Sequence, residues 1–450
     1  MDVHGAVASG LNHPGSGFRN PRILITFTWF FLLLAAYYLV RPVRDEMGAA
    51  AGVEQLPYLF LATLVAMLVL HPVLAWLVRC YRRRRVVAGL YGLFAWNLAV
   101  FYFLLSQGSE ETVLWAVRAF WVWLSVFNLF AISLFWSVTV DQLGVAEAKH
   151  WFGVLALGGT LGGAVGSGAA SLLSPLVAPV TLLPLSGVLL LAAAGFVLLL
   201  PARRCEAGPP AAADVPAAGE PLERELNLDQ PVGGSVWNGI LHTLRSSYLA
   251  GIALFMILFT TTTTFLYFQQ ADLFVREFAD RGVRTAMFAR VDVAVNLLAA
   301  VLQLVATRAL LERKGVRFTL LLLPVLSVGG FLLLAWLPAV AALIGFQVLR
   351  RAGNLALARP AREVLYTVVS LEDKYKAKNL LDTLVYRLGD QVGAWSWALL
   401  TGLGLGFRGV SLAAALLSVG WVCLAAWLGR RQEELATERF RVTANAAVDS

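Results

Sequence analysis

Twelve apolar stretches, each long enough to cross a bilayer as a helix, constrain the fold of this 450-residue chain. A helix needs about 20 predominantly apolar residues to span a hydrocarbon core of about 30 Å. Charged residues make up 14% of the chain and the mean hydropathy is +0.72, whereas a soluble domain carries about 25% charge. The sequence therefore predicts an all-α polytopic membrane protein with twelve transmembrane helices. The stretches run approximately over residues 23–44, 56–78, 86–105, 113–140, 152–173, 181–200, 248–269, 286–307, 318–336, 339–368, 378–404 and 409–428.

The distribution of positive charge predicts the orientation of these helices. Of the 36 Lys and Arg residues, 23 lie in segments on the same side as the N-terminus, six lie in loops on the opposite side, and seven lie within spans. Cytoplasmic loops of membrane proteins carry an excess of Lys and Arg. We therefore expect a multi-pass protein of the cell inner membrane with both termini in the cytoplasm. Because membrane topology explains the placement of the cations, the net charge of +8 predicts no nucleic-acid partner.

A polar segment with Pro209-Pro210 and mixed charges divides the spans six and six and is typical of a flexible linker. Asn128-Leu129 and Asn354-Leu355 occupy corresponding places in the two halves, which indicates a parallel repeat. Such a repeat predicts a transporter of two six-helix bundles with a central site at the middle of the membrane. The expected parts are an N-terminal bundle (1–200), a cytoplasmic linker (201–247), a C-terminal bundle (248–429) and a cytoplasmic tail (430–450).

The motif Arg-Pro-x-Arg followed by an acid occurs twice at membrane helices. One copy is Arg41 to Asp45, at the end of the first span, and the other is Arg359 to Glu363, inside the tenth. A charged side chain at the bilayer centre costs roughly 2.5–3.5 kcal/mol on insertion scales, so buried arginines usually have a function. The guanidinium fork matches carboxylate and phosphate oxygens. The repeated motif therefore predicts a cavity that binds an anion.

The tenth span carries a dense group of charges. Arg351 and Arg362 are eleven residues apart, so they would share one face of an uninterrupted helix. Pro360 is expected to weaken this helix locally and to free backbone carbonyls. The candidate anion-binding group is Arg41, Arg44, Arg351, Arg359 and Arg362. For the arginines of the tenth span, the alternative is ion pairs with acidic residues of neighbouring helices. For the arginines of the first span, the alternative is that their side chains extend to lipid headgroups.

Other polar and aromatic side chains extend this prediction. Tyr37 and Tyr38 are candidates for a wall that stacks on a flat ring, although an interfacial aromatic belt explains them equally well. The expected charge partners or coupling groups are Asp292, Asn296, Arg387 and Asp390, which lie in the eighth and eleventh spans.

Residue patterns of catalytic and metal sites are missing from the sequence. The five histidines have no ligand spacing and the three cysteines form no CxxC pair. Gly158, Gly162 and Gly166 lie in a glycine-rich span without the Gly-Lys-Ser/Thr of a phosphate loop, so they predict close helix packing. We expect no enzymatic activity, no metal and no cofactor.

Five segments of the chain form a set that is spread over nearly its whole length. They are residues 37–48 (YYLVRPVRDEMG), 127–142 (FNLFAISLFWSVTVDQ), 148–159, 267–270 (YFQQ) and 376–390 (KAKNLLDTLVYRLGD). Together they resemble the ATP:ADP antiporter family of nucleotide translocases, in particular its shorter homologues from free-living bacteria. This resemblance implies a fold similar to the major facilitator type and the exchange or uptake of nucleotides or related phosphorylated anions.

The expected function is that of an inner-membrane secondary transporter that moves an anionic small molecule by alternating access. A nucleotide or a related phosphorylated compound is the first candidate substrate, and the lipid bilayer is the other expected partner. One alternative is a proton-coupled transporter of another cargo, such as an organic acid or a lipid precursor. The other is a membrane sensor or assembly partner that does not transport.

Overall fold

The computed structural model describes residues 21–81, 83–143, 145–200, 246–369 and 381–448, and every regular element in these ranges is a helix. Ten of the described helices are individually long and apolar enough to span a membrane. Two further crossings are built from shorter pieces, so the predicted all-α polytopic fold with twelve crossings is confirmed. The predicted linker lies almost entirely outside the described residues.

The N-terminal half contains six long helices and two short 3₁₀ turns. They are α1 (Pro21–Ala50), η2 (Val53–Gln55), α2 (Leu56–Cys80), α3 (Arg83–Gln107), α4 (Glu110–Leu143), α5 (Val145–Leu173), η3 (Pro179–Thr181) and α6 (Leu182–Leu199).

The C-terminal half contains four long helices and two interrupted ones. The long helices are α8 (Ser247–Glu277), α9 (Arg281–Val305), α10 (Thr307–Trp336, kinked at Gly315) and α15 (Phe407–Val448). The interrupted ones are α11 (Val340–Gly353), η4 (Asn354–Ala358), α12 (Arg359–Leu365) and η5 (Tyr366–Val368), then η6 (Leu381–Val385) and α14 (Tyr386–Gly402). Because α15 continues to Val448, the predicted tail from residue 430 onward is helical through that residue.

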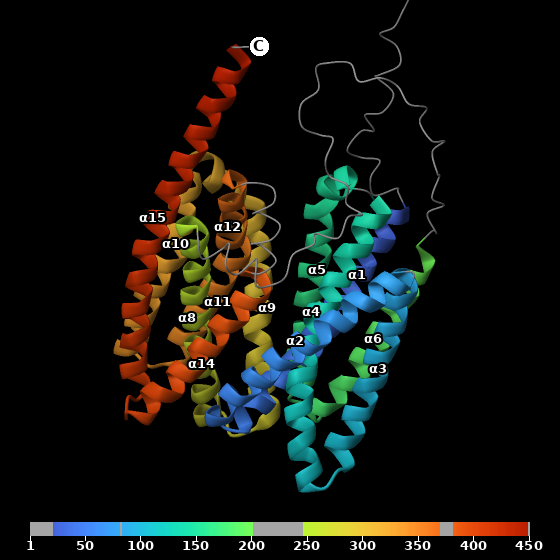
Figure 1. Ribbon diagram of the computed structural model, residues 1–450. Coiled ribbons are helices and arrows are strands. Elements are labelled where there is room, and N and C mark those ends of the chain that lie inside the picture. Colours follow the sequence, from blue (N-terminus) through green and yellow to red (C-terminus); the bar gives the residue numbers. More distant parts are fainter. Residues whose placement is uncertain (1–20, 82, 144, 201–245, 370–380, 449–450) are drawn as a thin grey trace, which may run out of the picture.

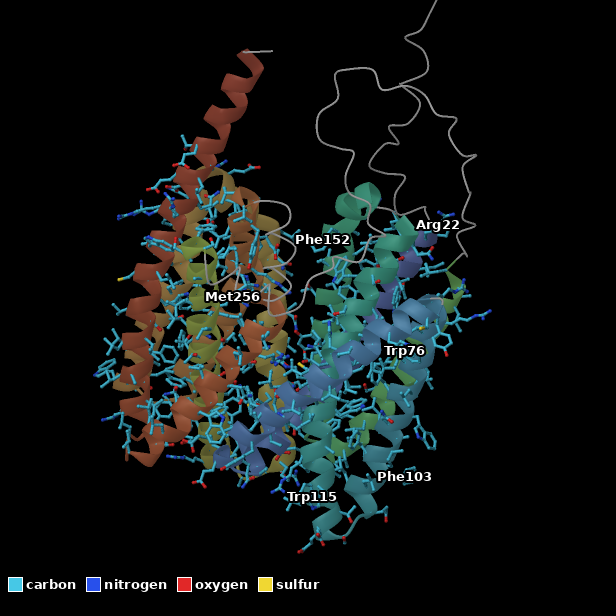
Figure 2. The ribbon with its side chains drawn as sticks, viewed as in Figure 1. Arg22, Trp76, Phe103, Trp115, Phe152 and Met256 are labelled. Carbon is cyan, nitrogen blue, oxygen red and sulfur yellow. The ribbon has the colours of Figure 1, made fainter. Side chains whose placement is uncertain are left out.

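The two halves form two bundles that lie side by side (Figure 1). In the first bundle α1 packs on α4, α5 and α6, and in the second α8 packs on α14 and α15. The described start of α1 and the end of α15 lie at the same end of the molecule. Large apolar side chains such as Trp76 and Phe103 point away from the bundles, as expected of helices that face lipid (Figure 2).

Glycines bring α5 close to α1. A Cβ atom at Gly162 would collide with the carbonyl oxygen of Phe31, and one at Gly166 would collide with that of Ala35. Small residues spaced by four let helix backbones approach in this way. The prediction that this glycine-rich stretch serves helix packing is confirmed.

The tenth crossing is interrupted where the sequence predicted local weakness. Pro360 has no N–H to donate to the carbonyl of Ala356, and the π-helical segment η4 ends two residues before it, at Ala358. The hydroxyl of Thr307 donates instead to the Ala356 carbonyl oxygen at 2.8 Å. The expectation of a freed backbone carbonyl is therefore confirmed.

The bundles are joined at the end that holds the α1–α2 and α8–α9 connections. There α2 runs obliquely from the second bundle to the first (Figure 1) and packs on both α14 and α4. Tyr58 of α2 meets Trp395 of α14 with their ring centroids 5.4 Å apart. One apolar core at this end includes Leu59 and Trp121 of the first bundle and Phe268 of the second. We call this the joined end of the molecule.

Candidate functional site

A polar cavity of about 250 Å³ lies between the two bundles, and we call it the central cavity. Helices of both bundles contribute charged and aromatic side chains to its wall. The contributors include Tyr38, Arg41 and Asp45 from α1, Thr263, Thr264, Tyr267 and Gln270 from α8, Asp292 from α9, Gln347, Arg350 and Arg351 from α11, and Tyr386 and Asp390 from α14.

A smaller cavity of about 130 Å³ lies next to it, and we call it the side cavity. Arg41, Tyr267 and Asp390 line both cavities, so the two are contiguous parts of one polar region. The side cavity adds the side chains of Arg44, Thr63, Trp121, Ser125, Arg387 and Gln391.

One carboxylate of the second bundle holds an arginine from each bundle. The Oδ1 atom of Asp292 lies 2.9 Å from Arg41 Nη1 and 2.7 Å from Arg351 Nη2. The Asp292 side chain is 2% exposed, and its other oxygen has no hydrogen-bond partner in the described structure. The α1–α9 part of this bridge crosses between the bundles, so movement of the bundles apart at this level would break it.

Arg44 and Asp45 form a second group on α1. Arg44 donates to Asp45 Oδ1 at 2.6 Å and to the Ser125 hydroxyl at 3.2 Å, and its guanidinium lies 4.7 Å from the Trp121 ring centroid. Tyr267 of the second bundle donates to the same Asp45 oxygen at 3.3 Å. Arg41 and Arg44 are therefore enclosed between the bundles, and they do not extend toward lipid headgroups.

Arg350 differs from these arginines because its partners are uncharged. Its guanidinium donates to the hydroxyls of Thr262, Thr263 and Ser327 at 2.7, 2.9 and 3.0 Å. It also donates to the Phe259 carbonyl at 3.2 Å. Arg350 is 1% exposed, lines the central cavity, and has no carboxylate partner in the described parts of the chain.

Glu46 of α1 closes the joined end with two arginines of α9. Arg284 Nη2 lies 2.8 Å from Glu46 Oε1, and Arg281 Nε lies 3.1 Å from the same oxygen. Glu46 and Arg284 are buried, whereas the Arg281 side chain is 57% exposed. This ion-pair group connects the bundles beyond the two cavities and lines neither of them.

The structure separates the arginines of the tenth crossing. Arg351 lines the central cavity, whereas Arg359 is exposed and Arg362 is buried, and neither of the latter two lines either cavity. The expected shared face of Arg351 and Arg362 assumed an uninterrupted helix. Each residue inserted by a π-helical turn shifts the following residues around the helix by about 100°. Because the π-helical segment η4 lies between Arg351 and Arg362, the helix is interrupted and the two side chains need not share a face.

The other predicted residues are divided between the cavities and the packed interior. Tyr38 lines the central cavity, but Tyr37 packs on Phe127 and lines neither cavity. Asn296 donates to the Asp292 carbonyl of its own helix at 2.9 Å and also lies outside both linings. Arg387 and Asp390 form an ion pair at 3.2 Å on α14, and both line the side cavity.

Sequence reasoning did not place Arg350 or its hydroxyl partners among the candidate site residues. Two signals were available in the sequence. Arg350 lies directly before Arg351 inside a span, and five consecutive threonines at residues 260–264 are unusual in an apolar helix. Thr262 and Thr263 also bond back to their own helix, through the Leu258 and Phe259 carbonyls, so the run would satisfy itself without any arginine. Only the packing of α8 against α11 connects the threonines to Arg350.

Comparison with protein-family models and with curated proteins finds no match. Solved structures of similar fold include the nucleoside transporter NupG, which has a TM-score of 0.55 and 15% identity and covers 90% of this chain and 97% of that chain. They also include a bacterial homologue of the human lysosomal transporter Spinster in an inward-facing, unoccupied conformation. It has a TM-score of 0.54 and 13% identity, and it covers 96% of both chains. These likenesses confirm the major facilitator type of fold.

Proposed function

We propose that this chain is a secondary transporter that moves an anionic small molecule by alternating access of its two bundles. The major facilitator fold provides two bundles around a central path. The main support for an anionic substrate comes from Arg350. This arginine is buried at the central cavity and has no carboxylate partner among the described residues. Burying an unpaired charge is costly, and a bound anion would remove that cost by serving as the counter-ion.

Within this class, a nucleotide or a related phosphorylated compound is our first candidate substrate. Arg350 and Arg351 are adjacent cationic groups that match phosphate oxygens, and Tyr38, Tyr267 and Tyr386 place aromatic rings in the same wall. A flat base beside an anionic tail would use both kinds of group. The sequence resemblance to the ATP:ADP antiporter family supports the same class and the exchange mode.

Asp292 provides a mechanism that links binding to movement of the bundles. Asp292 forms ion pairs with both Arg41 and Arg351, offsets one of their two positive charges, and holds α1 against α9. An arriving anion would compete with Asp292 for these two guanidinium groups. The exchange of partners would weaken the connection between the bundles while substrate is bound, and the joined end could then open.

The joined end is our candidate for the outer gate of a protein in the cell inner membrane. The excess of Lys and Arg at the opposite end supports a cytoplasmic location of both termini. In that orientation the structure would correspond to an inward-facing state, with Glu46, Arg281 and Arg284 closing the outer side.

The test is binding and transport with purified protein and a panel of solutes. The panel contains nucleotides, phosphate esters, organic acids and uncharged nucleosides, and the readouts are melting temperature in detergent and uptake or exchange in liposomes. A bound anion should raise the melting temperature by mass action, equivalent to about 2.7 kcal/mol at 100 times Kd. Arg350→Gln should abolish this rise.

Arg290→Gln is the matched control, because Arg290 is an exposed arginine of α9 that lines neither cavity. It should leave binding unchanged. If uncharged nucleosides bind and no anion does, or if Arg350→Gln binds anions as well as the wild type, the proposal is wrong.

A second candidate, proton-coupled transport of an organic acid or a lipid precursor, is supported by the carboxylates of the polar region. Asp390 lines both cavities, and one oxygen of Asp292 is buried without a hydrogen-bond partner in the described structure. A pH gradient would then drive uptake, and Asp390→Asn would abolish that dependence. Uptake that ignores the pH gradient would exclude this candidate.

A further inference from the structure

A large apolar groove lies on the first bundle, between α2 on one side and α3 and α4 on the other. Its volume is about 1180 Å³, and side chains such as Ala62, Leu93 and Val126 line it. It follows α2 from Tyr58 to Leu77, which is about 28 Å of helical rise. Such a length and volume suit a long apolar molecule.

The groove is separate from the proposed transport path. Helix α2 has the groove on one side and the side cavity on the other. Leu59 and Ala62 line the groove, whereas Phe60 and Thr63 line the side cavity. On α4, Val122 lines the groove and Trp121 lines the side cavity. Because α2 and α4 form the wall between them, a ligand in the groove would not occupy the central cavity.

Arg118 is the one charged residue among the described residues that line the groove. Its guanidinium lies 5.0 Å from the centroid of the Trp115 ring, and it has no carboxylate partner in the described parts of the chain. A cation in a membrane helix without a counter-ion favours a ligand that brings a negative charge.

Arg118 lies on α4 just inside the boundary of the hydrocarbon core, from which its long side chain reaches the level of the lipid headgroups. The helix has 34 residues, whereas about 20 are needed to cross the hydrocarbon core, so about seven residues extend beyond it at each end. Arg118 is eight residues after Glu110, the first residue of α4. Trp115 is 60% exposed at the same end (Figure 2), as is typical of an aromatic residue at the membrane interface.

We propose that this groove binds a phospholipid of the surrounding bilayer that has an anionic headgroup. The phosphate contacts Arg118, and an acyl chain lies along α2 between the apolar side chains of α3 and α4. A zwitterionic lipid would add a second positive charge near Arg118, so the site prefers a lipid of net negative charge. The bound lipid fills the space between α2 and the rest of the first bundle.

The experiment is native mass spectrometry of the full-length protein in detergent with equimolar phosphatidylglycerol and phosphatidylcholine. We expect retained adducts to favour phosphatidylglycerol, and Arg118→Gln to reduce this preference by about fivefold, the effect of one arginine on an acidic lipid. Arg118→Lys should retain part of it. Ala62→Trp, which fills the groove and leaves Arg118 in place, should reduce retention of both lipids.

Arg290→Gln is again the matched control, because it removes an exposed membrane-helix arginine that does not line the groove. It should leave the preference unchanged. Equal retention of the two lipids by the wild-type protein overturns the proposal, and so does a preference that survives Arg118→Gln. A size-exclusion profile like that of the wild type shows that each variant is folded.

Discussion

The arginines that line the central cavity of this protein have two different chemical surroundings. Arg41 and Arg351 share the carboxylate of Asp292, so one of their two positive charges is already offset before any ligand arrives. Arg350 is solvated by hydroxyls and a backbone carbonyl, so its charge stays available. Under the proposed function, this difference would give them different roles: Arg350 would attract an anion, and the arginines paired with Asp292 would respond to it.

Asp292→Asn tests the structural part of this division. The substitution leaves the partly buried Arg41 and Arg351 beside an uncharged amide, and breaking a fully buried ion pair costs about 3–5 kcal/mol, which is an upper bound here. We expect a clear fall in the melting temperature of the unloaded protein in detergent. The double variant Asp292→Asn with Arg351→Gln should recover part of this loss, because it removes one uncompensated charge; no recovery would contradict the shared-carboxylate interpretation.

Glu46 allows a comparison of a buried and an exposed partner of one carboxylate. Arg284→Ala should lower the melting temperature substantially, because the arginine and Glu46 are both buried. Arg281→Ala should change stability by less than about 1 kcal/mol, because its side chain is 57% exposed. Equal effects of the two substitutions would show that burial does not decide the strength of these ion pairs.

Helix contacts in this protein depend on where the glycines lie along each element. Gly162 and Gly166 of α5 lie against the α1 backbone, whereas Gly168 of the same helix has open space around its Cβ position. We expect Gly162→Ala to force α5 away from α1 and to lower the melting temperature by several degrees. Gly168→Ala is the matched control and should have little effect; the reverse order would refute the packing role.

Interrupted helices lie next to several candidate site residues of the second bundle. Segment η4 lies between Arg351 and Arg362, and segment η6 precedes Arg387 and Asp390. Irregular backbone in a membrane protein is tolerated where it lines a cavity or is buried in protein. In this structure Asn354 and Leu355 of η4 line the central cavity, so the interruption and the proposed site coincide.

The alternating access proposed above would require the two bundles to separate at the joined end. A short bifunctional thiol cross-linker between Tyr58→Cys and Trp395→Cys should therefore block transport, because it would tie α2 to α14. The background needs replacement of Cys80, Cys205 and Cys423. Each single-cysteine variant treated with the same reagent is the control, and full transport by the cross-linked double variant would exclude opening at this end.

The apolar pattern by itself determined the class of fold. Twelve stretches of sufficient length predict twelve crossings, because the bilayer core admits helices whose backbone groups are satisfied within the segment. The polar segment between the sixth and seventh stretches likewise predicted two groups of six. Arg41, Arg44, Arg351, Asp292 and Asp390 were also identified in the sequence, because ionisable residues are expensive in membrane spans and therefore conspicuous.

Tertiary structure alone decided which of these residues meet. The π-helical segment at Asn354–Ala358 changed the face on which residues beyond it lie, so Arg359 and Arg362 are outside the cavities that Arg351 lines. Arg350 emerged as the candidate anion contact because its partners come from α8 and α10, which are distant in sequence. Sequence spacing reports neighbours on one helix, whereas the hydrogen-bond and ion-pair partners of a buried arginine come from the other helices packed around it.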